Sequence, residues 1–242
     1  MTVEQEPPPF EMTGEAAAAI LELADDEFVL GHRHSEWLGL SPFLEEDLAM
    51  ASIAQDELGH ARALYALVWP SWTDRDAMVV RRPPANWRCC ALVERECVLW
   101  EDALVRHLLY DVAEAYRWRV LVDRFKATVP GLEALAARAL SEERYHHRHA
   151  VELVTRLGRG TTEANTRLQR SLEALWPDAV AMIDPEVDAM FFDECATVFA
   201  AAGLRRPATT GSRGDRRNRS DGFASIRDSL LAVPTIDPSA TW

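Results

Sequence analysis

Basic residues and long apolar runs are both scarce in this chain of 242 residues. It carries 26 Lys and Arg against 39 Asp and Glu, a net charge of -13, which excludes the basic footprint that a nucleic-acid-binding protein needs. No apolar run reaches the roughly 18 residues of a membrane span. Residues 1–10 are acidic and proline-rich, unlike a signal peptide. We therefore expect a cytoplasmic protein with no nucleic-acid partner and no membrane partner.

Cysteine is also rare, and the four cysteines that occur show no C-x-x-C spacing. They are Cys89, Cys90, Cys97 and Cys195. This usage is typical of reduced, structural thiols in a cytosolic protein. A redox role for the adjacent pair Cys89 and Cys90 is the alternative interpretation.

Glycine is sparse between residues 14 and 158, and β-branched runs with two-residue alternation are missing. Prolines fall between long stretches of helical periodicity, so the pattern predicts an all-α fold. We expect four long helices over residues 14–38, 42–68, 89–126 and 132–157. Ser41 is the expected N-cap of the second helix, with Pro42 at its first position. Four helices of this length, with one long central connection at residues 69–88, are typical of a four-helix bundle.

The C-terminal part of the chain is less regular. Further helices are predicted over residues 161–176, capped by Thr161 and stopped by Pro177, and over residues 186–202. Residues 203–220 hold six arginines and one aspartate without apolar periodicity. We interpret them as a solvated flexible segment, the alternative being a docking arm for an acidic partner or a phosphate-bearing ligand.

These patterns divide the chain into three parts. The expected parts are a flexible N-terminus (1–12), a helical bundle domain (13–202), and an Arg-rich segment with the C-terminal tail (203–242).

The four long helices carry charged residues on faces that should be buried. Their apolar stripes, spaced by three and four residues, each contain an acid, or an acid with a histidine, near the middle. Burying an unpaired carboxylate costs several kcal/mol, and four that converge also repel one another. Two divalent cations would balance them. Without metal, some of these acids should hold protons well above the usual carboxyl pKa near 4.

Spacing indicates that these residues meet. Two of the helices carry a glutamate and a histidine three residues apart, on one helical face. In each predicted hairpin the two glutamates lie about 15 residues either side of the turn, so antiparallel pairing sets them level. Four carboxylates with two imidazoles are the ligand set of di-iron and di-manganese helical bundles. The predicted metal ligands are Glu27, Glu57, His60, Glu114, Glu143 and His146.

The sequence leaves two interpretations open for three acids that lie next to the predicted ligands. Asp56 and Glu142 each precede a predicted ligand, and each could accept a hydrogen bond from the histidine of the opposite hairpin. Asp56 would then hold His146, and Glu142 would hold His60, fixing the ring tautomers; surface charge is the alternative. Asp111, one turn before Glu114, is the rival ligand on the third helix. The remaining histidines of interest are interpreted as surface or packing residues: His34, His147 and His149.

The residues around these positions resemble a known family. The runs LADDEFVLGHRHSEWLGLSPFLEEDLAMASIAQDELGHARALYAL and SEERYHHRHAVELVTRLG are similar to the ferritin-like subunits of the bacterial phenylacetyl-CoA ring-epoxidase family. The likeness covers roughly residues 20–180. In length, and in LADD, HR-x-SEW-x-G and RYH-x-R, the chain is similar to the smaller, structural member of these subunits, which generally lacks a working metal site. In QDE-x-GH and EE-x-x-H-x-R it is similar to the catalytic member.

The resemblance implies a ferritin-like four-helix bundle with additional C-terminal helices. It also implies that the same six residues are di-iron ligands, because their spacings agree with those of the catalytic member without a gap. One departure is Glu114, where the catalytic member usually has Asp. The chain is also shorter than the catalytic member, so the resemblance says least about the substrate.

We interpret the chain as a non-haem di-iron monooxygenase that activates O2 and inserts oxygen into a small organic substrate, with aromatic and acyl-CoA compounds as candidates. Manganese or a mixed Mn/Fe pair is the alternative to two iron ions. Electrons are expected from a separate reductase, since no flavin, nicotinamide or iron–sulfur motif is visible. The expected assembly is a homodimer or a hetero-oligomer with paralogous subunits. The competing functions are a non-catalytic scaffold in an epoxidase-like complex and a ferroxidase or iron-handling protein.

Overall fold

The computed structural model describes residues 12, 14–70, 79–183, 188–208 and 214–236, and every regular element in these segments is helical. The all-α prediction is confirmed. None of the helices within these segments is long and apolar enough to cross a membrane. Residues 1–11 of the predicted flexible N-terminus, and parts of the predicted connector, arginine-rich segment and tail, fall outside the described residues.

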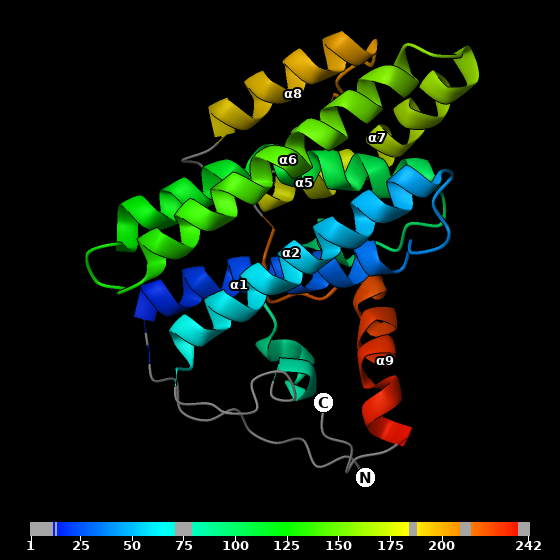
Figure 1. Ribbon diagram of the computed structural model, residues 1–242. Coiled ribbons are helices and arrows are strands. Elements are labelled where there is room, and N and C mark those ends of the chain that lie inside the picture. The colour runs from blue at the N-terminus through cyan, green and yellow to red at the C-terminus, as the bar shows by residue number, and fades with distance from the viewer. Residues whose placement is uncertain (1–11, 13, 71–78, 184–187, 209–213, 237–242) are drawn as a thin grey trace.

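Four long helices form the bundle, arranged as two antiparallel hairpins (Figure 1). α1 (Gly14–Ser35) packs along α2 (Leu44–Val68). α5 (Trp100–Phe125) packs along α6 (Leu132–Gly158). The two hairpins meet where α1 contacts α5 and where α2 contacts α6. Apolar stripes of all four helices join one buried core. This arrangement brings the middles of the four helices together.

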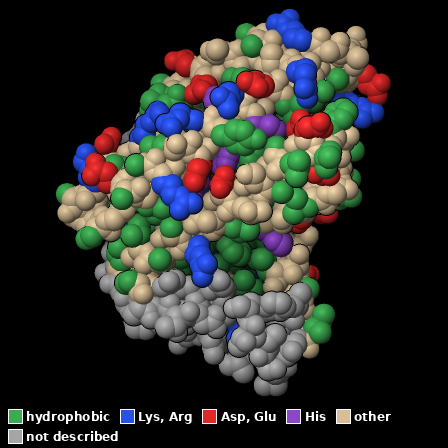
Figure 2. All heavy atoms as spheres, viewed as in Figure 1, with side chains coloured by type: hydrophobic (Ala, Val, Ile, Leu, Met, Phe, Trp, Pro, Cys, Tyr) green, Lys and Arg blue, Asp and Glu red, His purple; other side chains and the backbone are tan. Residues whose placement is uncertain are grey.

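Additional helices surround the bundle. α7 (Thr162–Met182) and α8 (Asp188–Ala202) cover α5 and α6. α9 (Asp221–Ile236) stands at one end and contacts the short α4 (Ala91–Glu94), which follows the single-turn η1 (Pro84–Asn86) (Figure 1). On the face drawn in Figure 2, acidic and basic side chains are interspersed over the bundle, with apolar side chains between them.

The two helices of the first hairpin approach each other closely at Gly31. A Cβ atom added there would lie 2.9 Å from Cγ of Leu58 and 3.0 Å from Cβ of Glu57. Only glycine therefore lets α1 come this near to α2, next to one of the predicted ligands. Gly59 lies on the exposed side of the same hairpin, and a Cβ atom there would meet nothing within 4 Å.

Two buried aspartates of α1 bind the irregular segments to the bundle. Asp26 accepts hydrogen bonds from Arg117 and Arg216, both at 2.7 Å, and from the Cys90 amide at 2.6 Å. Asp25 accepts a hydrogen bond of 2.5 Å from Arg82. Burial opposes ionisation of Asp26, but the two arginines outweigh it and lower the pKa of this carboxyl.

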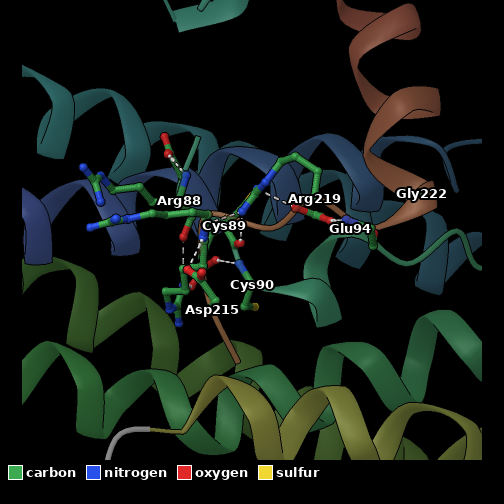
Figure 3. A network of polar contacts seen from close by, with 12 residues as sticks. Arg88, Cys89, Cys90, Glu94, Asp215, Arg219 and Gly222 are labelled. Carbon is green, nitrogen blue, oxygen red and sulfur yellow. Dashed lines mark hydrogen bonds and ion pairs between the residues drawn. The ribbon is translucent and has the colours of Figure 1, made fainter. Parts of the chain in front are cut away.

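A second polar network holds the start of α9 (Figure 3). Arg219 donates to the Glu94 carboxylate at 2.5 Å and to the Cys89 carbonyl at 3.0 Å, and the Ser220 amide donates to the other Glu94 oxygen at 2.7 Å. Phe223 then packs edge-on against the Trp87 ring, with centroids 5.4 Å apart. The Cys89 thiol belongs to this network, and burial raises its pKa, so a structural role fits it better than a redox role.

The solvated interpretation of the arginine-rich segment is therefore wrong for Arg216 and Arg219, which form ion pairs inside the chain. The prediction also omitted α9. Its apolar residues Phe223, Ile226 and Leu230 have helical spacing, but they find their partners only in segments far away in sequence. The division of the chain at residue 202 remains a prediction.

Three predicted helix boundaries are wrong. The second helix begins at Leu44 with Phe43 as N-cap, because Asp47 accepts hydrogen bonds from the Gly39 and Ser41 amides and keeps this turn outside the helix. The first helix likewise ends at Ser35 rather than at residue 38. α7 continues through Pro177 to Met182. Proline removes only one backbone donor, and burial of the last turn of α7 outweighs that loss.

The predicted third helix is broken at residues 95–99. Arg95 leaves the helical conformation, and its carbonyl accepts a hydrogen bond of 2.7 Å from Arg106. The Glu94 carbonyl accepts one of 3.0 Å from Arg33. These arginines bind carbonyls that a continuous helix would use, and the contact of Arg33 spans 61 residues, so local periodicity cannot predict it. The Thr161 cap is confirmed, since its hydroxyl accepts from the Ala164 amide at 3.1 Å.

Two glycine substitutions test the close contact in the first hairpin. Gly31→Ala should lower the free energy of unfolding by about 1–3 kcal/mol, because the hairpin must open to admit the methyl group. Gly59→Ala is the matched control and should raise it by about 0.5–1 kcal/mol, since alanine is the better helix former. Urea denaturation measures both. Equal effects of the two substitutions would contradict the close contact.

The buried pair of Asp26 with Arg216 gives a second test. Arg216→Ala should destabilise the fold by about 3 kcal/mol, since it removes a partner of a buried carboxylate. The neighbouring Arg217 is exposed, and Arg217→Ala should change stability by no more than about 0.5 kcal/mol. If urea denaturation shows that both substitutions change the free energy of unfolding only slightly, the 214–220 segment does not pack against the bundle in solution.

Candidate metal centre

The bundle brings the six predicted ligands to its middle, from all four helices. α1 supplies one, α5 supplies one, and α2 and α6 supply two each. All six are buried, with exposed fractions of at most 2%. The residues are Glu27 (α1), Glu57 and His60 (α2), Glu114 (α5), and Glu143 and His146 (α6).

Five of these residues form a compact set. Glu27, Glu57, His60, Glu114 and Glu143 each offer one ligand atom, and these atoms all lie within 4.8 Å of one another. His146 lies beside this set, with its Nδ1 3.3 Å from Oε2 of Glu143 and 3.5 Å from Oε1 of Glu57. The two hairpins therefore set their acids level, and one small volume holds four carboxylates.

The two histidines point the same way. His60 Nδ1 faces the cluster, 3.3 Å from Oε2 of Glu27 and 3.3 Å from Oε1 of Glu143. His146 also turns its Nδ1 inward. Each ring therefore offers one nitrogen to the centre of the cluster and keeps the other for a contact outside it.

The outer nitrogens meet the two acids that the sequence suggested. His60 Nε2 lies 2.7 Å from Oε2 of Glu142, and His146 Nε2 lies 3.2 Å from Oδ2 of Asp56. Both contacts run between α2 and α6 and so join the two hairpins. A carboxylate at Nε2 holds the ring proton there and leaves Nδ1 free to bind a metal.

The pKa values of the acids are pushed in opposite directions. Burial, together with the charges of the neighbouring glutamates, raises the pKa of Glu27 and Glu114 well above the ordinary carboxyl range. Burial also opposes ionisation of Glu143, but the close approach of His146 and His60, each 3.3 Å from one of its oxygens, outweighs it and lowers its pKa to about 2. The raised carboxyl pKa values that the sequence predicts therefore occur at Glu27 and Glu114, whereas the pKa of Glu143 is lowered.

Many ligand atoms in the cluster lack a hydrogen bond. Buried polar atoms in proteins are normally paired, so orphaned atoms at one place call for an explanation. A pair of cations satisfies carboxylate oxygens and imidazole nitrogens together, so the donor set fits the metals that the sequence suggested. The orphaned atoms are Oε1 of Glu27, both oxygens of Glu57, Oε2 of Glu114, both oxygens of Glu143, and Nδ1 of His146.

Aromatic and apolar groups close the cluster off from solvent. Trp118 is fully buried, its Nε1 donates to Oε1 of Glu114 at 3.3 Å, and its ring lies edge-on to His60 at 6.0 Å. Ile53 and Leu30, which are 0% exposed, lie one turn from Glu57 and Glu27 on the same stripes. Charges in such surroundings interact more strongly than they do in water.

Asp111 is placed differently from the six. It is buried, with Oδ1 3.3 Å from Nδ1 of His107, and lies outside the compact set. Its pKa is raised by burial and by Glu143. His34 and His149 lie in the same region, although the sequence indicated only surface or packing roles. The spacing of seven residues from Glu27 to His34 places His34 two helical turns further along the same face of α1. This spacing was the signal in the sequence for a second group of polar residues inside the bundle.

Two comparisons with known proteins identify the family of the chain. The family model described as "Phenylacetic acid catabolic protein" matches residues 1–242. The chain is also similar to the C subunit of the 1,2-phenylacetyl-CoA epoxidase of Escherichia coli (strain K12). The two are 30% identical over 220 residues, which cover 90% of this chain and 83% of that protein. The chain therefore belongs to the phenylacetic acid catabolic protein family.

Proposed function

We propose that this protein is a non-haem di-iron oxygenase whose two iron ions are bound by the six residues of the cluster. The observation that carries the proposal is the set of buried carboxylate oxygens without a hydrogen-bond partner, at the point where four helices meet. Manganese, or one manganese with one iron, suits the same oxygen and nitrogen donors.

Each part of the cluster has a task in this proposal. A bound pair of ferrous ions supplies the electrons and open coordination positions that O2 activation requires. The four glutamates supply negative charge that balances two divalent cations. Asp56 and Glu142 keep the proton of each histidine on Nε2, so that Nδ1 faces the metals. Trp118 and the apolar stripes keep bulk water away from the reacting atoms.

We infer the substrate class and the assembly from the relative. Its name describes one subunit of an enzyme that epoxidises phenylacetyl-CoA, and an aromatic acyl-CoA compound is the corresponding candidate here. A hetero-oligomer with paralogous subunits is the corresponding assembly. A separate reductase remains the proposed electron source.

The second candidate function is a non-catalytic scaffold, and one observation favours it. The relative with 30% identity is the C subunit of its complex, and the sequence resemblance implies that the structural member of the family generally lacks a working metal site. A scaffold needs no bound metal, so iron content separates the two functions.

Iron content and the response to O2 test the proposal. The purified chain is loaded anaerobically with ferrous iron, desalted and analysed for metal, then exposed to O2 while its visible spectrum is recorded. Glu57→Ala and His146→Ala should each lose iron and the O2-dependent absorption, because each removes a ligand. Glu45 is exposed on the same helix as Glu57, and Glu45→Ala should behave as the unaltered chain.

Two outcomes of this experiment reject the di-iron proposal. Iron near zero in a chain with an intact helical circular dichroism spectrum favours the scaffold. Unchanged iron content in both ligand variants shows that the metal is bound elsewhere.

The contacts of Asp56 and Glu142 with the histidines give a separate prediction. Asp56→Ala and Glu142→Ala should each weaken metal binding by about 10–100-fold, because the histidine loses the group that fixes its tautomer. Competition with a chelator of known affinity measures the effect. Glu152, exposed on α6, gives the control Glu152→Ala, which should leave the affinity unchanged. Equal affinities for all three variants would assign Asp56 and Glu142 to surface charge.

A further inference from the structure

Two buried histidines and one partly buried histidine form a second cluster next to the carboxylates. His34 of α1 and His107 of α5 are 0% exposed, and their ring centroids lie 5.0 Å apart. The ring of His149, from α6, lies 5.8 Å from that of His107. The proposed di-iron ligands do not include any of these three residues.

The helix register places this cluster in a layer of its own. His34 follows Glu27 by seven residues, and His107 precedes Glu114 by seven, in the opposite chain direction. Seven residues are two helical turns, or about 10 Å along the bundle. The second layer therefore lies towards the end of the bundle at which α1 ends and α2 begins.

The ring nitrogens of this layer are unsatisfied. Neither nitrogen of His34 or His107 has a hydrogen-bond partner, and Nδ1 of His149 also lacks one. Asp111 approaches His107 to 3.3 Å, but both of its oxygens are without a hydrogen bond too. Neutral imidazoles in a protein interior normally have at least one partner. Five orphaned ring nitrogens at one place indicate a shared ligand.

His149 shows the arrangement of a metal-binding histidine. Its Nε2 lies 2.8 Å from Oε2 of Glu46, and its Nδ1 is left free. A carboxylate on one ring nitrogen commonly orients the other towards a metal. Glu46 also lines a cavity of about 390 Å³, together with Phe43 and Trp100. Because Glu46 both lines the cavity and contacts His149, it offers a cation a route from the cavity to that histidine.

The protonation state of the rings suits a cation. Burial lowers the pKa of His107 to about 3 and that of His34 well below its usual range. Burial and the nearby His107 likewise lower the pKa of His149. All three rings are therefore neutral at pH 7, and a neutral imidazole keeps the lone pair that binds a metal.

We propose that His34, His107 and His149 bind a borderline divalent cation such as Zn²⁺, Fe²⁺ or Co²⁺, at a site separate from the carboxylate centre. Three imidazoles around a tetrahedral ion, with metal–nitrogen distances of about 2.0–2.1 Å, have ring centres about 5 Å apart. The observed separations of 5.0 and 5.8 Å are close to this. Among the described residues only the carboxylate centre has three or more ligand atoms within 4.8 Å of one another, so binding requires the histidine rings to turn.

Cobalt titration of the full chain tests the site, in a background that disables the carboxylate centre. The parent for the test carries Glu57→Ala and His60→Ala. This parent should bind one Co²⁺ per chain and show the visible absorption of four-coordinate cobalt. Adding His34→Leu and His107→Leu should weaken Co²⁺ binding by more than the roughly 10–100-fold that loss of an outer partner costs. It should also abolish the absorption.

The control changes a histidine of the same helix that lies outside the cluster. His32 is half-buried, and Glu36 and Arg33 are the charged groups that act on it. His32→Leu in the same parent should leave the stoichiometry and the absorption unchanged. Metal content of the unaltered chain is measured in parallel, so loss of the carboxylate centre and loss of the histidine site are counted separately.

Thermal denaturation provides a readout that does not depend on the spectrum. Leucine at positions 34 and 107 removes buried polar atoms that have no partner, so the metal-free variant should unfold at no lower temperature than its parent. Co²⁺ should then raise the melting temperature of the parent but not that of the variant. A parent that binds no Co²⁺, or a histidine variant that binds it equally well, overturns the proposal.

Discussion

Carboxylates held together in a dry interior repel one another, and several contacts in this protein form around the group of acids where that repulsion acts. Four glutamates meet where four helices cross, with no exposed surface to relieve their charge. Burial alone makes ionisation unfavourable, and each neighbouring acid makes it more so. The two histidines turn Nδ1 towards these carboxylates, while Asp56 and Glu142 hold the rings from outside. The unpaired oxygens that remain define the proposed metal-binding site.

α1 shows how the chain separates structural acids from ligands. Asp25, Asp26 and Glu27 are consecutive, and all three are 0% exposed. Arg82 neutralises Asp25, and Arg117 with Arg216 neutralises Asp26. Glu27 makes no ion pair with any arginine of the described segments and faces three other carboxylates instead. The same helix thus uses arginine where an acid serves the fold and leaves an acid open where a cation can bind.

The sequence predicts the convergence of the candidate ligands because helix geometry sets it, whereas their role as metal ligands remains a proposal. Equal distances from a turn place Glu27 opposite Glu57, and a three-residue spacing places His60 on the same face as Glu57; both are properties of a single hairpin. The contact of Arg33 with the Glu94 carbonyl at the helix break, and the position of Arg216 beside Asp26, depend on partners 60 or more residues away along the chain. Local periodicity contains no information about such partners, so the α9 segment and the broken third helix were missed.

The second layer of histidines was missed for another reason. His34 lies two helical turns from Glu27, and His107 lies two turns from Glu114, on the same predicted buried faces. A single buried histidine usually has a hydrogen-bond partner in a neighbouring residue, so neither position drew attention by itself. Only the structure shows that both rings lack a partner and that they lie 5.0 Å apart. The identity of a residue and its burial follow from the sequence pattern, whereas the absence of a hydrogen bond is a property of the packed interior.

The likeness to the C subunit of an epoxidase and the presence of six candidate metal ligands can be weighed on physical grounds. Replacing buried ionic groups by apolar residues of similar volume is often neutral or stabilising, so a chain that only supports a partner gains nothing from four buried acids. The core beside them is already dense, with Trp118, Leu30 and Ile53 almost completely buried. The acids weaken this core unless cations neutralise them. The cost they impose on the metal-free fold is therefore the strongest argument that the protein binds metal.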